Sequence, residues 1–125
     1  MDHQLTIKNE ISISGVGLHT GNNVTLNFKP APANHGISFK RIDLKSQPII
    51  EASASYVTDT ERSTTICKDG VKIQTPEHFL AACAGLKIDN ILIEIDAEEL
   101  PILDGSSVEY IKCLKKAELH KQNAV

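Results

Sequence analysis

Two things are scarce in this 125-residue sequence: aromatic side chains and positive charge. Aromatic residues make up 4% of the chain, with no tryptophan, and the formal net charge is −3. Proteins that bind nucleic acid need a basic face, and those that bind single strands also use aromatic platforms for the bases. The sequence therefore argues against a nucleic acid as partner.

Long apolar runs are also missing. A helix that spans a bilayer needs about 20 consecutive apolar residues, and no run in the sequence approaches that length. The first residues, Met-Asp-His-Gln, lack the basic and then apolar pattern of a secretory signal peptide. We therefore expect no transmembrane segment and a cytoplasmic protein.

Cysteine is sparse, and its spacing gives neither a disulfide framework nor a Cys-x-x-Cys motif. Cys67, Cys83 and Cys113 are odd in number and far apart, so we expect free thiols that are buried or half-buried. What remains, 41% hydrophobic and 23% charged residues, is typical of a folded globular protein. The length predicts one domain over residues 1–120, with residues 121–125 as a frayed tail or the start of a linker.

The first two-thirds of the chain has the two-residue periodicity of strands. Apolar and polar residues alternate near residues 5–13, 24–28 and 37–41. The Asp-Gly pair at residues 69–70 predicts a two-residue turn between two strands, because both of its residues tolerate positive φ. A later apolar run at residues 91–95 predicts one more strand, with its isoleucines on one face.

Two segments in the last third have helical signals instead. Thr75 as N-cap and Pro76 at the first helical position predict the start of one helix. Ser106 and Glu109 form a capping box that predicts the start of a second helix. Strands followed by a helix, a strand and a helix predict an α+β fold: a two-layer domain in which a mixed β-sheet carries two α-helices on one face.

Three glycines fall within residues 15–21, Gly-Val-Gly-Leu-His-Thr-Gly. The spacing is not the Gly-x-Gly-x-x-Gly of dinucleotide-binding folds, and no helical pattern follows it, which excludes a Rossmann site. Two interpretations stay open. The segment is either a turn between strands whose glycines adopt positive φ, or a loop that holds His19 at a cleft.

A carboxylate and an imidazole stand side by side in Thr-Pro-Glu-His at residues 75–78. The positive end of a helix dipole favours an ionised Glu77 and disfavours a protonated His78. A neutral imidazole suits a metal ion, and a carboxylate suits a general base. Neighbouring helical residues point about 100° apart, so the pair would flank one site. A glutamate in a first helical turn is also common for structural reasons alone.

A complete zinc site needs more than these two residues. Catalytic zinc takes three protein ligands, and of the five histidines only His19 and His78 lie in motif-like settings. The hydroxyl-rich run at residues 58–65, around Arg62, is either a polar loop or an edge that faces sugar or phosphate oxygens. Asp104 is followed by glycine, which fits ordinary turn chemistry.

Together, and in this order, the motifs resemble one family. They are Gly-Val-Gly-Leu-His-Thr-Gly at 15–21, Arg-Ser-Thr-Thr at 62–65, Thr-x-Glu-His at 75–78, Asp-Asn at 89–90 and Pro-Ile-Leu-Asp-Gly-Ser at 101–106. The family is the zinc-dependent UDP-3-O-acyl-N-acetylglucosamine deacetylases of lipid A biosynthesis. The resemblance runs from about Gln4 to Leu119, and the stretch 39–50 is most similar to the subgroup fused to a β-hydroxyacyl-carrier-protein dehydratase.

The resemblance implies a zinc-dependent amide hydrolase with two similar α+β domains, the zinc ion between them, and UDP-3-O-acyl-N-acetylglucosamine as substrate. The matching motifs make His78 a zinc ligand and Glu77 the general base. The family's other two ligands come from a His-x-x-x-Asp helix of the second domain, which has no counterpart in this sequence. The same match assigns supporting or substrate-binding roles to His19, Arg62, Ser63, Thr64 and Asp104.

The sequence departs from the family at Pro76, which replaces an aliphatic residue, and at Ala97 and Glu98, which replace a Gly-Pro-like turn. We expect the chain to supply only the first domain of the enzyme and to be inactive alone. Two alternatives stay open. One is a non-catalytic module that binds a sugar nucleotide or a protein partner, and the other is a structural domain whose motifs coincide with those of the family.

Overall fold

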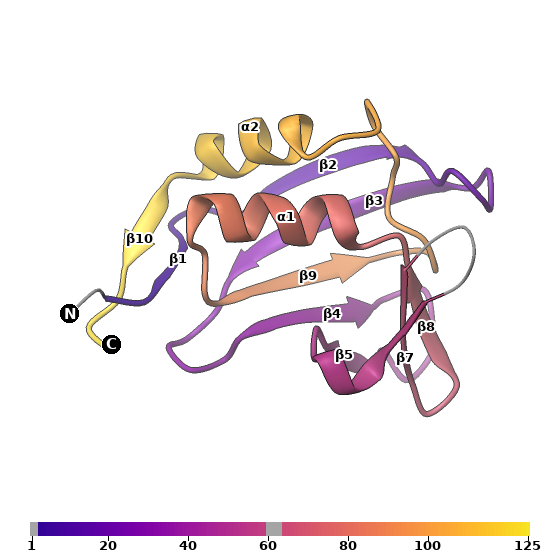
Figure 1. Cartoon of the computed structure of the whole chain (residues 1–125), viewed down its shortest axis with the longest axis horizontal. Helices are drawn as coiled ribbons and strands as arrows, with labels where there is room; N and C mark the ends of the chain where they lie inside the picture. Colours follow the sequence, from indigo (N-terminus) through magenta and orange to yellow (C-terminus); the bar gives the residue numbers. More distant parts are fainter. Residues whose placement is uncertain (1–2, 60–63) are drawn as a thin grey trace.

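The computed structural model describes residues 3–59 and 64–125, and it contains one large sheet, two helices and two smaller strand groups (Figure 1). The large sheet has five strands in the spatial order β2-β3-β9-β4-β5, of which β4 and β9 run parallel. The bounds are Ile11–Val16 for β2, Asn23–Pro30 for β3, Ile37–Arg41 for β4, Ile49–Glu51 for β5 and Ile91–Ile95 for β9. The predicted mixed sheet is confirmed.

Both helices, α1 (Glu77–Leu86) and α2 (Val108–Ala117), lie on one face of this sheet (Figure 1). Phe79 of α1 stacks on Phe28 of β3, with ring centroids 5.3 Å apart, and it meets Phe39 and Tyr110 edge-on. All four rings are buried, so most of the few aromatic residues form the centre of the core. The predicted two-layer α+β class, with two helices on one face, is confirmed.

A separate three-stranded antiparallel sheet stands at one end of the large one (Figure 1). It consists of β6 (Val57–Asp59), β7 (Thr64–Lys68) and β8 (Val71–Gln74), and the one-turn 3₁₀ helix η1 (Ala54–Tyr56) leads into it. Asp69 and Gly70 have φ of 53° and 80°, which makes the predicted tight turn between β7 and β8 a type I′ turn. Arg41 joins the two sheets, because its Nη1 donates to the Lys72 carbonyl at 2.8 Å.

The two ends of the chain pair with each other. Strand β1 (Leu5–Ile7) runs antiparallel to β10 (Leu119–Lys121), and beyond β10 the Gln122 N–H donates to the Gln4 carbonyl at 2.8 Å. The segment 121–125, predicted as a frayed tail or the start of a linker, thus begins as the end of a strand ladder. The start of a linker, the other possibility for this segment, stays a prediction.

Both helix starts differ from their predicted caps. Pro76 is the N-cap of α1, and Thr75 instead donates its hydroxyl to Glu99. Ser107 is the N-cap of α2, and neither N-cap makes a side-chain capping hydrogen bond. The predicted capping box between Ser106 and Glu109 is also wrong. The Ser106 hydroxyl instead accepts from the Val108 N–H and donates to the Asp104 carboxylate.

The cysteines are free, as predicted, and Cys83 and Cys113 are buried. Burial raises the pKa of the Cys83 thiol to about 12, so it packs as a neutral apolar group. Within the described ranges 3–59 and 64–125, neither helix is long and apolar enough to cross a membrane.

Candidate active site

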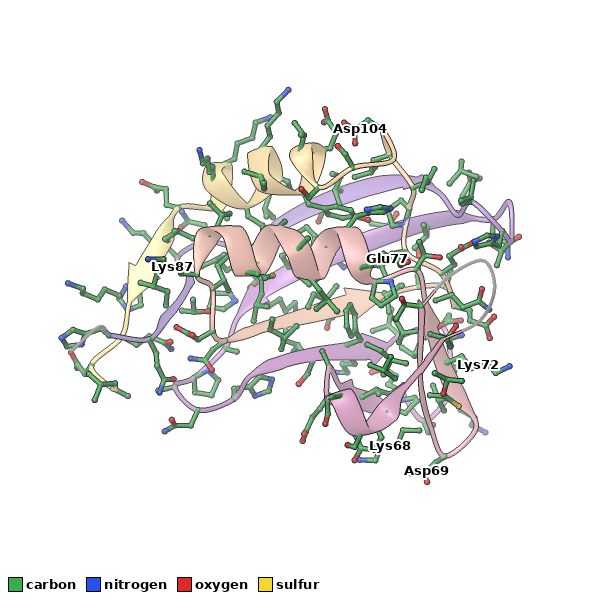
Figure 2. The ribbon with its side chains drawn as sticks, viewed as in Figure 1. Lys68, Asp69, Lys72, Glu77, Lys87 and Asp104 are labelled. Carbon is green, nitrogen blue, oxygen red and sulfur yellow. The ribbon has the colours of Figure 1, made fainter. Side chains whose placement is uncertain are left out.

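Glu77 and His78 form the first turn of α1, beside the end of the three-stranded sheet (Figure 2). Both residues are half-buried. The Glu77 Oε2 atom accepts from the Thr64 N–H at a long 3.4 Å, and the Oε1 atom is buried without a hydrogen-bond partner among the described residues. An unpartnered buried carboxylate oxygen is costly, and in an active site it is an acceptor held ready for water or substrate.

The glycine loop lies next to the segment that follows β9. Gly17 forms an isolated antiparallel bridge with Pro101, and the Gly21 N–H donates to the Gly17 carbonyl at 3.0 Å. Of the three glycines only Gly21 has positive φ, at 70°. A Cβ on Gly15 would lie 2.8 Å from the Pro101 Cβ, so Gly15 allows the loop to pack closely against this segment.

Glu99, which the sequence did not single out, lies between this loop and α1. Its Oε1 atom accepts from the backbone N–H groups of His19 and Thr20, each at 2.9 Å, and its Oε2 atom accepts from the Thr75 hydroxyl at 2.6 Å. A Cβ on Gly17 would come within 2.6 Å of Oε1. One feature of the sequence indicates that Glu99 is buried: it begins the apolar run Glu-Leu-Pro-Ile-Leu, where a solvated side chain is not expected.

The electrostatic surroundings of Glu99 favour its charged form. Desolvation alone would raise its pKa, because the residue is only 1% exposed. The hydrogen bonds from Thr75, Thr20 and His19, together with the nearby His19 side chain, outweigh desolvation and hold the pKa below its ordinary value. Glu99 is therefore a buried anion with both oxygens hydrogen-bonded.

Asp104 lies in the loop that leads into α2 (Figure 2). Its carboxylate accepts from the Ser106 hydroxyl at 2.9 Å and from the Ser106 N–H at 3.1 Å, and these bonds lower its pKa. The side chain is exposed, and its contacts are those of the turn chemistry that the sequence offered as one interpretation. A supporting role for Asp104 at the cleft stays a prediction.

The structure brings four of the sequence-predicted site residues to one end of the domain. Thr64 contacts Glu77 directly, His78 follows in the same helical turn, and exposed His19 is linked to the entrance of α1 through Glu99. The predictions for Arg62 and Ser63 lie outside the described residues. Among residues 3–59 and 64–125, no three His, Cys, Asp or Glu side chains are grouped so that they could hold a metal ion.

This fold and site define the class: an α+β domain that presents a carboxylate and an imidazole at a helix start. A sequence model of the family LpxC, UDP-3-O-acyl N-acetylglycosamine deacetylase, matches residues 4–125. The chain therefore belongs to the UDP-3-O-acyl-N-acetylglucosamine deacetylase family, and the family resemblance drawn from its motifs is confirmed.

Individual relatives agree with this assignment. The chain is 49% identical over 124 residues to the UDP-3-O-acyl-N-acetylglucosamine deacetylase of Saccharophagus degradans, and 44% identical over 124 residues to that of Xylella fastidiosa. It is 48% identical over 122 residues to the bifunctional enzyme LpxC/FabZ of Bacteroides thetaiotaomicron. These matches cover 98–99% of this chain but only 41%, 41% and 26% of the respective relatives, so the chain spans less than half of their length.

Proposed function

We propose that this chain supplies the first domain of a zinc-dependent deacetylase that removes the N-acetyl group of UDP-3-O-acyl-N-acetylglucosamine in lipid A biosynthesis. The observation that carries the proposal is the pair at the start of α1, where Glu77, next to His78, keeps one buried oxygen without a partner among the described residues. The identity of 44–49% to deacetylases of this name supports it. A cytoplasmic location, as expected from the sequence, is part of the same proposal.

The residues present fit a part of a zinc site. His78 offers an imidazole, a ligand typical of catalytic zinc, and Glu77 beside it offers the carboxylate that a catalytic zinc site uses as a base. Catalytic zinc needs three protein ligands. We therefore propose His78 as the one ligand from this chain, with the other two from a second deacetylase domain, in the same chain or in another.

Glu77 is the general base of the proposed reaction. Bound zinc would supply Lewis-acid activation of a water molecule and of the amide carbonyl. Glu77 accepts the proton of the attacking water on its unpartnered Oε1, while its other oxygen is held by the Thr64 N–H. The water oxygen bonds to the carbonyl carbon, the C–N bond breaks, and the proton held by Glu77 passes to the sugar nitrogen, so acetate and the free 2-amine are released.

The outer face of α1 is the proposed contact with the second domain. Residues 79–86 contain no charged side chain, and Ala81, Ala84 and Gly85 are exposed, with Leu80 half-buried. A helix that is apolar on all sides is normally covered on all sides. The large sheet covers one side of α1, and the unmatched length of the relatives provides a source for the cover on the other.

The test combines this chain with the part of the Saccharophagus degradans relative that lies beyond the match. We expect acetate release from UDP-3-O-acyl-N-acetylglucosamine by the combination and not by the chain alone. Glu77→Gln should lower kcat by about 10²–10⁴-fold, whereas Glu109→Gln, on the exposed side of α2, should leave it unchanged. A normal rate from the chain alone would refute the shared site.

The non-catalytic alternative makes a different prediction for binding. A sugar-nucleotide module should bind UDP-N-acetylglucosamine tightly in a calorimetric titration without zinc, whether or not Glu77 is present. A half-site for catalysis should bind it weakly until the second domain is added. Tight, metal-independent binding by the chain alone would therefore favour the module.

A further inference from the structure

We propose that Glu99 is a positioning residue that sets the relative placement of the His19 loop and the Glu77–His78 turn. The proposal rests on the proposed function for its consequence in catalysis, but not for its geometry. One buried carboxylate connects two segments that the chain separates by more than fifty residues. Neither segment makes the site alone, so their common support decides how they face each other.

The two oxygens of Glu99 serve the two segments separately. Oε1 accepts from the N–H groups of His19 and Thr20 at 2.9 Å, which fixes the backbone on which the His19 side chain is carried. Oε2 accepts from the Thr75 hydroxyl at 2.6 Å, one residue before the N-cap of α1. Hydrogen bonds to a carboxylate are shorter and stronger than neutral ones, so the link is stiff.

Thr75 shows what the second half of this link holds in place. Its φ is 57°, a left-handed conformation that is rare and strained for a β-branched residue and that persists only where the surroundings impose it. The Thr75 N–H donates to the Thr64 carbonyl at 3.0 Å, and the hydroxyl donates to Glu99. Together these bonds hold a backbone turn that directs the chain into α1, and Glu77 follows two residues later.

Gly17 and Gln74 show that the position of Glu99 is itself fixed. The approach of Oε1 to Gly17 leaves no room for a Cβ, although the φ of Gly17 is not left-handed. On the other side, Gln74 forms a parallel bridge with Glu99, and the Leu100 N–H donates to the Gln74 carbonyl at 3.1 Å. The carboxylate thus packs against the Gly17 backbone while the bridge to Gln74 fixes the backbone of Glu99, as a support for an active site requires.

The first experiment uses the 125-residue chain alone, so its result does not depend on the proposed function. Glu99→Gln removes the charge and keeps the shape, and Glu109→Gln, on α2, is the control for the loss of a carboxylate elsewhere. By NMR, we expect the amide protons of His19 and Thr20 to exchange about tenfold faster in Glu99→Gln. We also expect the His78 ring signals to shift in that variant and not in the control. Unchanged exchange and unchanged ring signals in Glu99→Gln would overturn the proposal.

The second experiment measures activity in the two-domain combination, and it cuts the link at Thr75. Thr75→Val keeps the shape and loses the hydroxyl, and Thr75→Ser keeps the hydroxyl. We expect Thr75→Val to lower kcat by about 10–100-fold with KM within about threefold, because a small misplacement of catalytic groups costs rate more than binding. Thr75→Ser should recover most of that loss. A Thr75→Val enzyme with normal kcat, or a Thr75→Ser enzyme as impaired as Thr75→Val, would overturn the proposal even where Glu99→Gln fails to fold.

An inactive wild-type combination would count against the proposed function alone. In that case NMR of the 125-residue chain still decides the inference, from the amide exchange of His19 and Thr20 and the His78 ring signals in the Thr75→Val and Thr75→Ser variants. Thr75→Val should shift the His78 ring signals, and Thr75→Ser should not. Identical His78 signals in both variants would refute a role for Glu99 in placing the first turn of α1.

Discussion

At the scale of single residues, the Arg41–Asp43 pair gives the clearest prediction. Arg41 is buried, and its Nε and Nη2 donate to the two Asp43 oxygens at 2.8 and 2.7 Å. Hydrogen bonding to this guanidinium lowers the pKa of Asp43. Asp43→Asn should therefore lower the free energy of unfolding at pH 7 by about 2 kcal/mol, the size of a hydrogen bond between charged groups. Urea denaturation measures this change.

The pH dependence follows from the direction of that shift. A carboxyl whose pKa is lower in the folded state stabilises above its unfolded pKa of about 4, and the effect is lost as the pH falls through the folded value. The difference between wild type and Asp43→Asn should thus be constant from pH 7 to about 5 and shrink below about pH 4. The control is Glu109→Gln, which removes an exposed pair with Lys112 and should change stability by less than about 0.5 kcal/mol. A difference that grows in acid would contradict the argument.

The same scale shows what the sequence could predict about the site. Glu77 and His78 stand next to each other, so a short motif reveals both the carboxylate and the imidazole. Glu99 contacts backbone N–H groups that lie about 80 positions away. The apolar run that follows Glu99 indicates a buried carboxylate, but only the folded chain reveals which N–H groups it binds and that Gly17 leaves room for it.

At the scale of elements, replacing glycine by alanine should change the free energy of unfolding in opposite directions at two positions. Gly85 lies in α1, and a Cβ there would meet nothing within 4 Å, whereas Gly70 in the turn between β7 and β8 has φ of 80°. Gly85→Ala should raise the free energy of unfolding by about 0.5–1 kcal/mol, because alanine favours the helix. Gly70→Ala should lower it by about 1 kcal/mol, because alanine tolerates that φ poorly. Chemical denaturation of the two variants of this chain measures both, and effects of the same sign would contradict this account.

Elements were predictable where their signals are local. The Asp-Gly turn carries its own conformational preference, and the alternating isoleucines of β9 show which face is buried. The start of α1 was less predictable. The sequence assigns the Thr75 hydroxyl to a helix cap, but in the fold this hydroxyl donates to the charged carboxylate of Glu99, which forms a stronger hydrogen bond. Strand β10 has no burial pattern of its own, since all three of its residues are exposed, and it exists only because β1 is there to pair with it.

At the scale of the whole molecule, Asn90 connects segments from both ends of the chain. It is 2% exposed, its Oδ1 accepts from the Gly36 N–H at 2.8 Å, and its Nδ2 donates to the Oε1 atoms of Gln4 and Gln122, each at 2.8 Å. Asn90→Ala would leave these groups short of partners while the β1–β10 ladder keeps its backbone bonds. We expect a loss of about 2–3 kcal/mol in the free energy of unfolding. Asn123→Ala, at an exposed position, should change it by less than about 0.5 kcal/mol.

The distribution of the loss tests whether the two ends act as one unit. If Asn90 connects β1 and β10 to the rest of the domain, amide protection of Gln122, whose N–H donates to the Gln4 carbonyl, should fall further in Asn90→Ala than protection in β3 or β9. The core of those strands packs around Phe28 and Phe79, whereas the Asn90 side chain makes its hydrogen bonds to Gly36, Gln4 and Gln122, outside both strands. Uniform loss of protection across the sheet would instead mean that Asn90 supports the global fold. Site-resolved hydrogen exchange of wild type and Asn90→Ala therefore separates a local clamp on the terminal strands from a general contribution to stability.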